Sequence, residues 1–93
     1  MFTHIAIHTP KPEHRDDVIA SMRRAGDASD GAEGLLQMGP WQEIDCGRLV
    51  GLAIWESREA FLAAAPGIFA AVNDDPFDEW EAEPTVSLQL EEV

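Results

Sequence analysis

The sequence contains a single cysteine, Cys46, and only six basic residues among its 93. One cysteine cannot form a disulfide within the chain, so nothing in the composition requires an oxidising compartment, and we expect a cytoplasmic protein. Eighteen acidic residues outweigh the basic ones and give a net charge of -12. This charge repels phosphate backbones and anionic lipid surfaces, so we expect neither nucleic acid nor a membrane as a partner.

Long hydrophobic runs are also missing. No apolar segment approaches the roughly 20 residues that a membrane helix needs, and the first residues lack the basic start and apolar stretch of a signal peptide. A chain of this length fits one domain, residues 1–93. A domain of that size buries only about 60 to 65% of its unfolded surface, so an isolated monomer would be marginally stable and we expect a partner surface.

What the sequence does contain is a set of apolar patterns that predict six elements in the order β-α-β-β-α-β. The expected strands cover residues 2–9, 35–44, 49–55 and 86–91, and the expected helices cover residues 13–28 and 58–72, the second broken or kinked at Pro66 and Gly67. This order is the ferredoxin-like split βαβ arrangement, an α+β fold with two helices on one face of an antiparallel sheet. The other face needs a cover, so we predict a homodimer formed through the sheet face.

The stretch from Ala53 to Phe61, AIWESREAF, follows a Gly34-Leu35 pair that opens the second strand. These residues resemble the antibiotic biosynthesis monooxygenase-like group of dimeric α/β-barrel proteins. The resemblance implies a dimeric α/β barrel with a pocket between sheet and helices, lined by Trp55. The group includes cofactor-free quinone-forming oxygenases, haem-degrading enzymes and members with no assigned chemistry.

The haem-degrading branch of that group is expected to carry an asparagine on the first strand and a histidine on the second helix. Residues 1–10 contain no asparagine, and residues 58–73 contain no histidine. The resemblance therefore does not extend to haem degradation, and we expect no bound cofactor.

A register argument adds further candidates for the pocket. If residues 45–47 form the hairpin loop, strand pairing puts Trp41 opposite Gly51 and Gln37 opposite Trp55 on one face. Either Trp41 then fills the space over Gly51 or a hollow remains for a flat ligand. We predict that Trp55, Trp41 and Gln37 bind substrate, with Gln37 donating a hydrogen bond to a developing oxyanion. The alternatives are a buried core role for Trp55 and a packing or dimer-contact role for Trp41.

His4 and His8 fall on the same face of the first strand, although the sequence leaves open whether that face lines the pocket. Four residues of strand separate them by about 13 Å, which is too far to bind one zinc ion, so no metal site follows. Either could act as a catalytic general base, because the unperturbed pKa of histidine lies near neutrality. The alternative for both is a hydrogen-bonded structural role.

Other polar residues have simpler interpretations. The acidic stretch over residues 74–83 lacks the ligand spacing of a calcium loop, so we expect a solvated face. Ser57 is explained as the cap of the second helix.

The resemblance and the candidate residues together predict a cofactor-independent monooxygenase-like protein that acts on a small flat aromatic or phenolic substrate. The alternative is a noncatalytic dimeric module of the same fold that binds a small apolar molecule or a protein partner. A polar group placed inside the aromatic pocket would favour catalysis.

Overall fold

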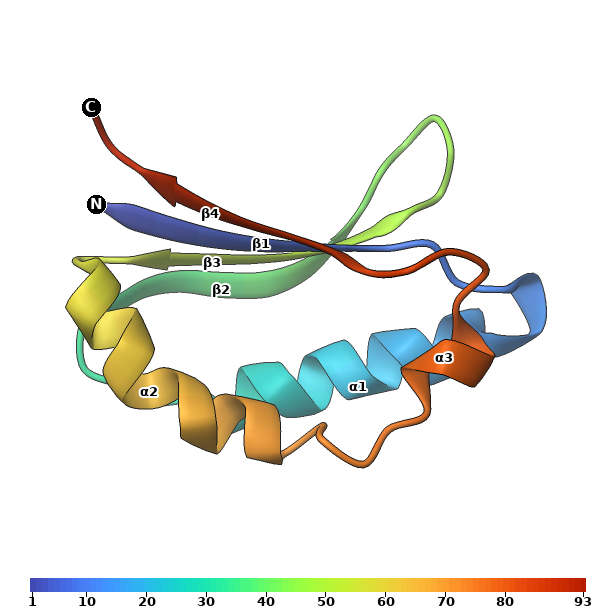
Figure 1. Cartoon of the computed structure of the whole chain (residues 1–93), viewed down its shortest axis with the longest axis horizontal. Coiled ribbons are helices and arrows are strands. Elements are labelled where there is room, and N and C mark those ends of the chain that lie inside the picture. The colour runs from blue at the N-terminus through green and yellow to red at the C-terminus, as the bar shows by residue number, and fades with distance from the viewer.

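The computed structural model describes all 93 residues and consists of a four-stranded antiparallel sheet above a layer of helices (Figure 1). The strands are β1 (Phe2–His8), β2 (Leu35–Gln42), β3 (Leu49–Trp55) and β4 (Val86–Glu91), in the spatial order β2-β3-β1-β4. The helices are α1 (Arg15–Ala28), α2 (Arg58–Ala70) and the single turn α3 (Phe77–Trp80), with a 3-10 turn at Pro12–His14 ahead of α1. The predicted ferredoxin-like α+β fold is confirmed. None of the helices is long and apolar enough to span a membrane.

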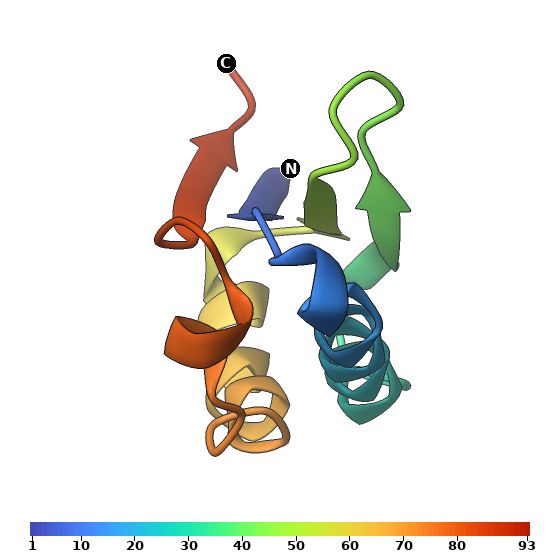
Figure 2. The ribbon, with the colours of Figure 1, turned by 90° about the vertical axis from the view of Figure 1, so that its right-hand side faces the viewer.

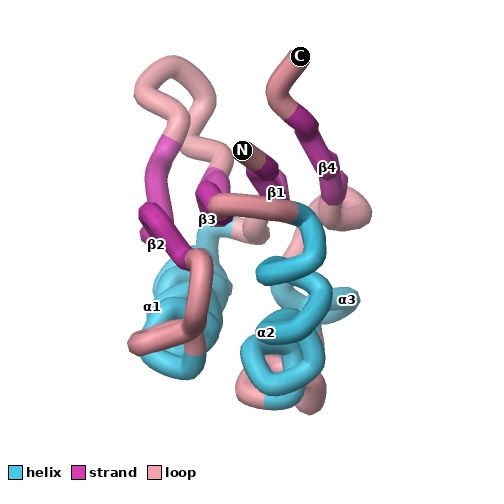
Figure 3. Tube along the Cα trace, turned by 90° about the vertical axis from the view of Figure 1, so that its left-hand side faces the viewer, coloured by secondary structure: helices cyan, strands magenta, loops and turns pink.

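All three helices lie on the same side of the sheet. Viewed from either end, α1 runs beneath β2 and β3, whereas α2 and α3 run beneath β1 and β4 (Figures 2 and 3). No element covers the other side, which we call the open face. Cross-strand pairing assigns the alternate residues of every strand to it. Its members include Ile5, Ile7, Gln37, Trp41, Val50, Ile54, Val86, Leu88 and Leu90.

The start of α2 follows from local sequence. Ser57 is extended, and its Oγ accepts a hydrogen bond from the backbone N–H of Ala60 at 3.1 Å, which confirms the predicted cap. Phe61, Ala65 and Ile68 are then buried at helical spacing. Of the break or kink expected at Pro66 and Gly67, the break does not occur, because α2 continues through both residues to Ala70. The hydrogen bond that this proline cannot donate falls on the exposed side of the helix, where water can replace it.

The β2–β3 pairing differs from the predicted register by one residue. From the hairpin to Gln37 the pairing is regular, with Trp41 opposite Val50 and Gln37 opposite Ile54. Leu36 is then an extra residue in β2, beyond which Leu35 lies opposite Trp55 as a helix-facing residue. The predicted pairs Trp41 with Gly51 and Gln37 with Trp55 were wrong. The error arose at the hairpin loop, because Glu43, rather than Ile44, pairs with Arg48 and the loop has one residue more than expected. In the single chain β2 is an edge strand, the position in a sheet where a proline such as Pro40 is tolerated.

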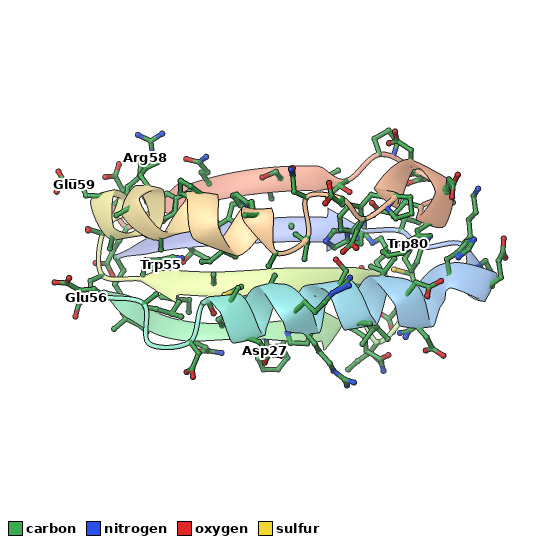
Figure 4. All side chains as sticks on the ribbon, turned by 90° about the horizontal axis from the view of Figure 1, so that it is seen from below. Asp27, Trp55, Glu56, Arg58, Glu59 and Trp80 are labelled. Atoms are coloured by element: carbon green, nitrogen blue, oxygen red, sulfur yellow. The ribbon has the colours of Figure 1, made fainter.

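The main hydrophobic core lies at the end of the sheet where α2 begins, and Figure 4 shows Trp55 there, opposite the end that carries Trp80 and α3. Trp55 is 1% exposed and meets Phe61 edge to face, with ring centroids 6.0 Å apart. Phe2 packs on the same Phe61 ring at 5.1 Å. Full burial of each of these side chains contributes about 1.5 to 3 kcal/mol to folding.

Candidate functional site

A cavity of about 320 Å³ lies between the middle of the sheet and the helices. Its floor is made of small residues, because Ala6 pairs directly with Gly51 across β1 and β3, and Ala53 follows on the same face. Larger apolar side chains from the helices, from β2 and from the chain after α2 form the walls: Met22, Met38, Ile68, Phe69, Val72 and Phe77. Such a space suits a flat, mostly apolar molecule.

The hollow over Gly51 is one of the two outcomes that the sequence left open. A side chain at this position would approach α1, because a Cβ built on Gly51 lies 3.6 Å from the Cε of Met22. Pro40, rather than Trp41, is the β2 residue opposite Gly51. A proline ring leaves more room there than an indole would, so the space stays open.

Polar groups enter this apolar space from β1 and from the chain around the start of β4. His4, His8, Thr85 and Ser87 all line the cavity, and Ser21 reaches it from α1. The face of β1 that carries Phe2, His4, Ala6 and His8 is therefore the one that lines the pocket, a point that the sequence left undecided.

His8 forms a buried pair with Glu81. The Nδ1 of His8 lies 2.9 Å from the Oε1 of Glu81, and the two side chains are 11% and 4% exposed. The other carboxylate oxygen, Oε2, accepts a hydrogen bond from the Oγ1 of Thr85 at 2.5 Å. The His8 ring also stacks on Phe77, with centroids 5.7 Å apart.

Backbone pairing brings Glu81 to His8 across 73 residues of sequence. The N–H of Lys11 donates to the carbonyl of Trp80, and the N–H of Ala82 donates to the carbonyl of Thr9, both at 2.8 Å. These bonds fix the backbone on either side of Glu81 against the end of β1. The prediction of a uniformly solvated acidic stretch was therefore wrong at Glu81, which is 8% exposed.

His4 has different surroundings at the other end of the cavity. Its Nε2 lies 3.0 Å from the hydroxyl oxygen of Ser87, and its ring stacks on Phe61 with centroids 5.1 Å apart. Burial disfavours the charged imidazolium and lowers the pKa of His4 below its ordinary value of 6.5. At neutral pH His4 is thus an uncharged group that can either donate or accept a hydrogen bond.

The structure separates the five predicted site residues into two groups. His4 and His8 share the cavity, whereas Trp55 lies in the core cluster and is absent from the cavity wall. Trp41 is 54% exposed on the open face, and Gln37 lies on that face too. The predicted grouping of Trp41 and Gln37 with Trp55 fails because Glu43, rather than Ile44, pairs with Arg48, and this one-residue difference at the hairpin puts both side chains on the opposite side of the sheet.

Sequence reasoning missed Glu81, Thr85 and Phe77 as neighbours of His8. The pairing of Ile7 with Val86 places Thr85 beside His8 when the register is extended by one residue, and this pairing is known only from the structure. No His, Cys, Asp or Glu side chains converge in a group of three or more that could hold a metal ion.

Comparison with solved structures shows the same fold in proteins of low sequence identity. Rv0793 from Mycobacterium tuberculosis is 19% identical with a TM-score of 0.83, over 99% of this chain and 94% of that one. PA3566 from Pseudomonas aeruginosa is 19% identical with a TM-score of 0.79, over 99% and 93%. A variant of MhuD with two manganese protoporphyrin IX molecules bound per active site is 20% identical with a TM-score of 0.75, over 100% and 95%.

The sequence itself matches a family model. No curated protein matches it significantly, but the model described as antibiotic biosynthesis monooxygenase matches residues 1–65. This region contains β1, α1, the β2–β3 hairpin and the first half of α2, so it covers most of the scaffold. The chain belongs to the antibiotic biosynthesis monooxygenase family.

Proposed function

We propose that this chain is a monooxygenase-like protein that holds a small, flat phenolic or polycyclic substrate in the cavity and oxygenates it without a bound cofactor. The observation that carries the proposal is a 320 Å³ cavity whose wall is mainly apolar but includes two histidines. Family membership adds support, since it favours a monooxygenase-like or small-molecule-binding protein.

The shape of the cavity agrees with such a substrate. Small-molecule sites usually enclose about 300 to 1,000 Å³ and combine apolar walls with a few polar groups. Here the floor of Ala6, Gly51 and Ala53 allows close approach of a planar ring system, while Met22 and Met38 can adapt to its faces. The two histidines stand at either end of this floor and can contact oxygen substituents of the ligand.

The chemistry that this arrangement supports begins with removal of a proton from the substrate. A histidine accepts the proton of a phenol or of an activated methylene group, and the resulting carbanion or phenolate gives an electron to dioxygen. For an anthrone, one atom of dioxygen forms the new carbonyl group, and the other leaves as water with the two methylene hydrogens. The protein positions the substrate, excludes water and accepts the proton.

Turnover of anthrone under air, followed as anthraquinone formation, tests this function. His4→Ala and His8→Ala each remove one cavity histidine, whereas His14→Ala removes the one histidine that does not line the cavity. Loss of a general base lowers the rate about 10²- to 10⁴-fold, and the His14 variant should keep the wild-type rate. Equal rates in all three variants would contradict the assignment of either cavity histidine. Binding of anthraquinone without turnover of anthrone would favour the small-molecule-binding module instead.

The same proposal includes a homodimer formed through the open face. Val86, Leu88 and Leu90 are 41 to 49% exposed there and Trp41 is 54% exposed. An apolar stripe of this kind on a small domain marks an interaction surface. Sedimentation velocity should report a dimer for the wild type and a monomer for Leu88→Asp. The matched variant Leu62→Asp changes a leucine that is 48% exposed on α2 and should remain dimeric. A monomeric wild type would remove this part of the proposal.

A further inference from the structure

The two cavity histidines differ in the groups that hold them, and the difference starts with Glu81. An ionised carboxylate can only accept hydrogen bonds, so a proton must lie on the Nδ1 of His8, 2.9 Å from the Oε1 of Glu81. The Thr85 hydroxyl occupies Oε2 and limits rotation of the carboxylate. A neutral His8 in this pair therefore has its proton on Nδ1 and a bare Nε2.

The Nε2 of His8 is free to accept a hydrogen bond from a ligand. It makes no hydrogen bond within the chain, and the one buried side-chain nitrogen or oxygen without a partner is the Nε1 of Trp55. The Nε2 of His8 thus keeps accessible surface, although the residue as a whole is only 8% exposed. Because His8 lines the cavity, this is the surface through which a ligand can reach it.

The arrangement is set by the fold before any ligand binds. Backbone hydrogen bonds from Lys11 to Trp80 and from Ala82 to Thr9 hold the backbone of Glu81 in place. The stacked ring of Phe77 restrains the imidazole plane from the side. A base whose partners are preorganised needs little rearrangement when a proton is transferred.

His4 lacks such a constraint. Its partner is the hydroxyl of Ser87, which can donate or accept, so the hydrogen bond does not select one tautomer. No carboxylate contacts His4 to stabilise a positive charge. A proton transferred to His8 instead produces an imidazolium that is hydrogen bonded to Glu81.

We propose that Glu81 is a positioning residue that fixes His8 as the Nδ1–H tautomer and leaves Nε2 as the proton acceptor of the cavity. The proposal rests on the proposed function for the identity of the proton donor, a phenolic or methylene group of the ligand. It assigns to His4 the separate task of hydrogen bonding the opposite end of that ligand.

Long-range ¹H–¹⁵N spectra of the wild-type protein labelled at histidine test the tautomer directly. His4→Gln and His14→Gln assign the signals, and the sample is titrated until the His8 signal reports a neutral ring. We expect neutral His8 to show a protonated Nδ1 and a bare Nε2. If neutral His8 in the wild-type protein carries its proton on Nε2, the proposal is wrong.

Glu81→Leu then removes the carboxylate that accepts a hydrogen bond from His8 and replaces it with an apolar side chain of similar size. The neutral His8 of this variant should shift to the Nε2–H form that an unconstrained imidazole favours, and an unchanged tautomer would contradict the role of Glu81. Glu79→Leu, which changes an exposed acid of the same turn, should keep the wild-type spectrum.

Turnover of anthrone separates this inference from the function on which it rests. With a functional wild type, Glu81→Leu should lower kcat about 10- to 100-fold while changing KM less than about threefold. A variant with the shifted tautomer and wild-type kcat would overturn the assignment of Nε2 as acceptor. If the wild-type protein has an unprotonated Nε2 on His8 but does not turn over anthrone, the positioning role of Glu81 is supported and the proposed oxygenation is contradicted.

Discussion

Gly51 and Met22 lie beside each other in the cavity lining, with 3.6 Å between the Cε of Met22 and the point where a Cβ on Gly51 would lie. That distance is an ordinary van der Waals contact, so a side chain at position 51 meets the flexible end of Met22 without a clash. The cavity floor is open there because β3 has a glycine at this position. Substitution of Gly51 can therefore alter the cavity without straining the sheet.

Gly51→Val should fill the floor and abolish ligand binding while leaving the protein folded. The β-branched side chain favours a strand and removes the entropic cost of glycine, which is about 0.5 to 1 kcal/mol. The γ-methyls of valine reach beyond the Cβ position and displace the flexible end of Met22, so we expect cooperative thermal unfolding to be retained together with at least a tenfold weaker affinity for a hydroxyanthraquinone in a fluorescence titration. Gly67→Ala changes a glycine of α2 with open space around it and should leave the affinity unchanged. Wild-type affinity in Gly51→Val would show that the ligand binds elsewhere.

The lowered pKa of His4 makes folding stability depend on pH. Between its folded-state pKa and the ordinary value of 6.5, the unfolded chain carries more proton at His4 than the folded chain does. The free energy of unfolding therefore rises with pH across this window, and the contribution of His4 is fully present only above pH 6.5. Urea unfolding at several pH values should show this rise in the wild type and a shallower one in His4→Gln. The matched variant His14→Gln should retain the His4 contribution, and identical slopes in wild type and His4→Gln would contradict the buried state of His4.

Asp75 should hold the segment between α2 and α3 in place. Its Oδ2 accepts hydrogen bonds from the Oγ of the fully buried Ser21 and from Arg24, both at 2.6 Å. Asp75→Ala leaves the Ser21 hydroxyl without this partner, at a cost of about 1 to 3 kcal/mol. We expect faster amide hydrogen exchange over residues 71–85, measured by mass spectrometry. The exposed neighbour offers a control, Asp74→Ala, which should exchange as the wild type does. Unchanged exchange in Asp75→Ala would mean that this contact does not restrain the segment.

Trp55 should act on stability rather than on ligand binding. Trp55→Phe keeps an aromatic ring against Phe61 and removes the buried Nε1 that has no hydrogen-bond partner. We expect a loss of about 1 to 2 kcal/mol in urea unfolding, below the 3 to 5 kcal/mol of truncation to alanine. Affinity for a hydroxyanthraquinone should change less than about threefold. Trp80→Phe, a partly exposed position, should alter stability by no more than about 0.5 kcal/mol. A large loss of affinity in Trp55→Phe would instead indicate that Trp55 contacts the ligand.

The residues whose structure depends on near neighbours were predictable from the sequence. Ser57 and Phe61 lie four residues apart, and the cap and the first buried turn of α2 follow from that spacing. His4 and His8 share a face because side chains alternate along a strand. These relationships need no knowledge of which distant segments meet.

The residues that were not predicted depend on distant pairing or on an exact residue count. Glu81 reaches His8 only after β4 has paired with β1, and no local pattern marks that one acid among its neighbours. All of the cavity residues after α2 also lie outside the region matched by the family model: Val72, Phe77, Thr85 and Ser87. Family membership therefore fixes the scaffold and leaves this wall of the cavity to be determined by structure.

The extra residue at Leu36 affects only the end of β2 that lies farthest from the β2–β3 hairpin. From Gln37 to Gln42 the strand pairs regularly with β3, so Pro40 stands opposite Gly51 and Trp41 lies on the open face. Deleting Leu36 would leave Leu35 next to Gln37 and still opposite Trp55, with the rest of the strand in place. The pairing that keeps the cavity open is therefore set at the hairpin, and a relative of this protein could lose the bulge without losing the ligand site.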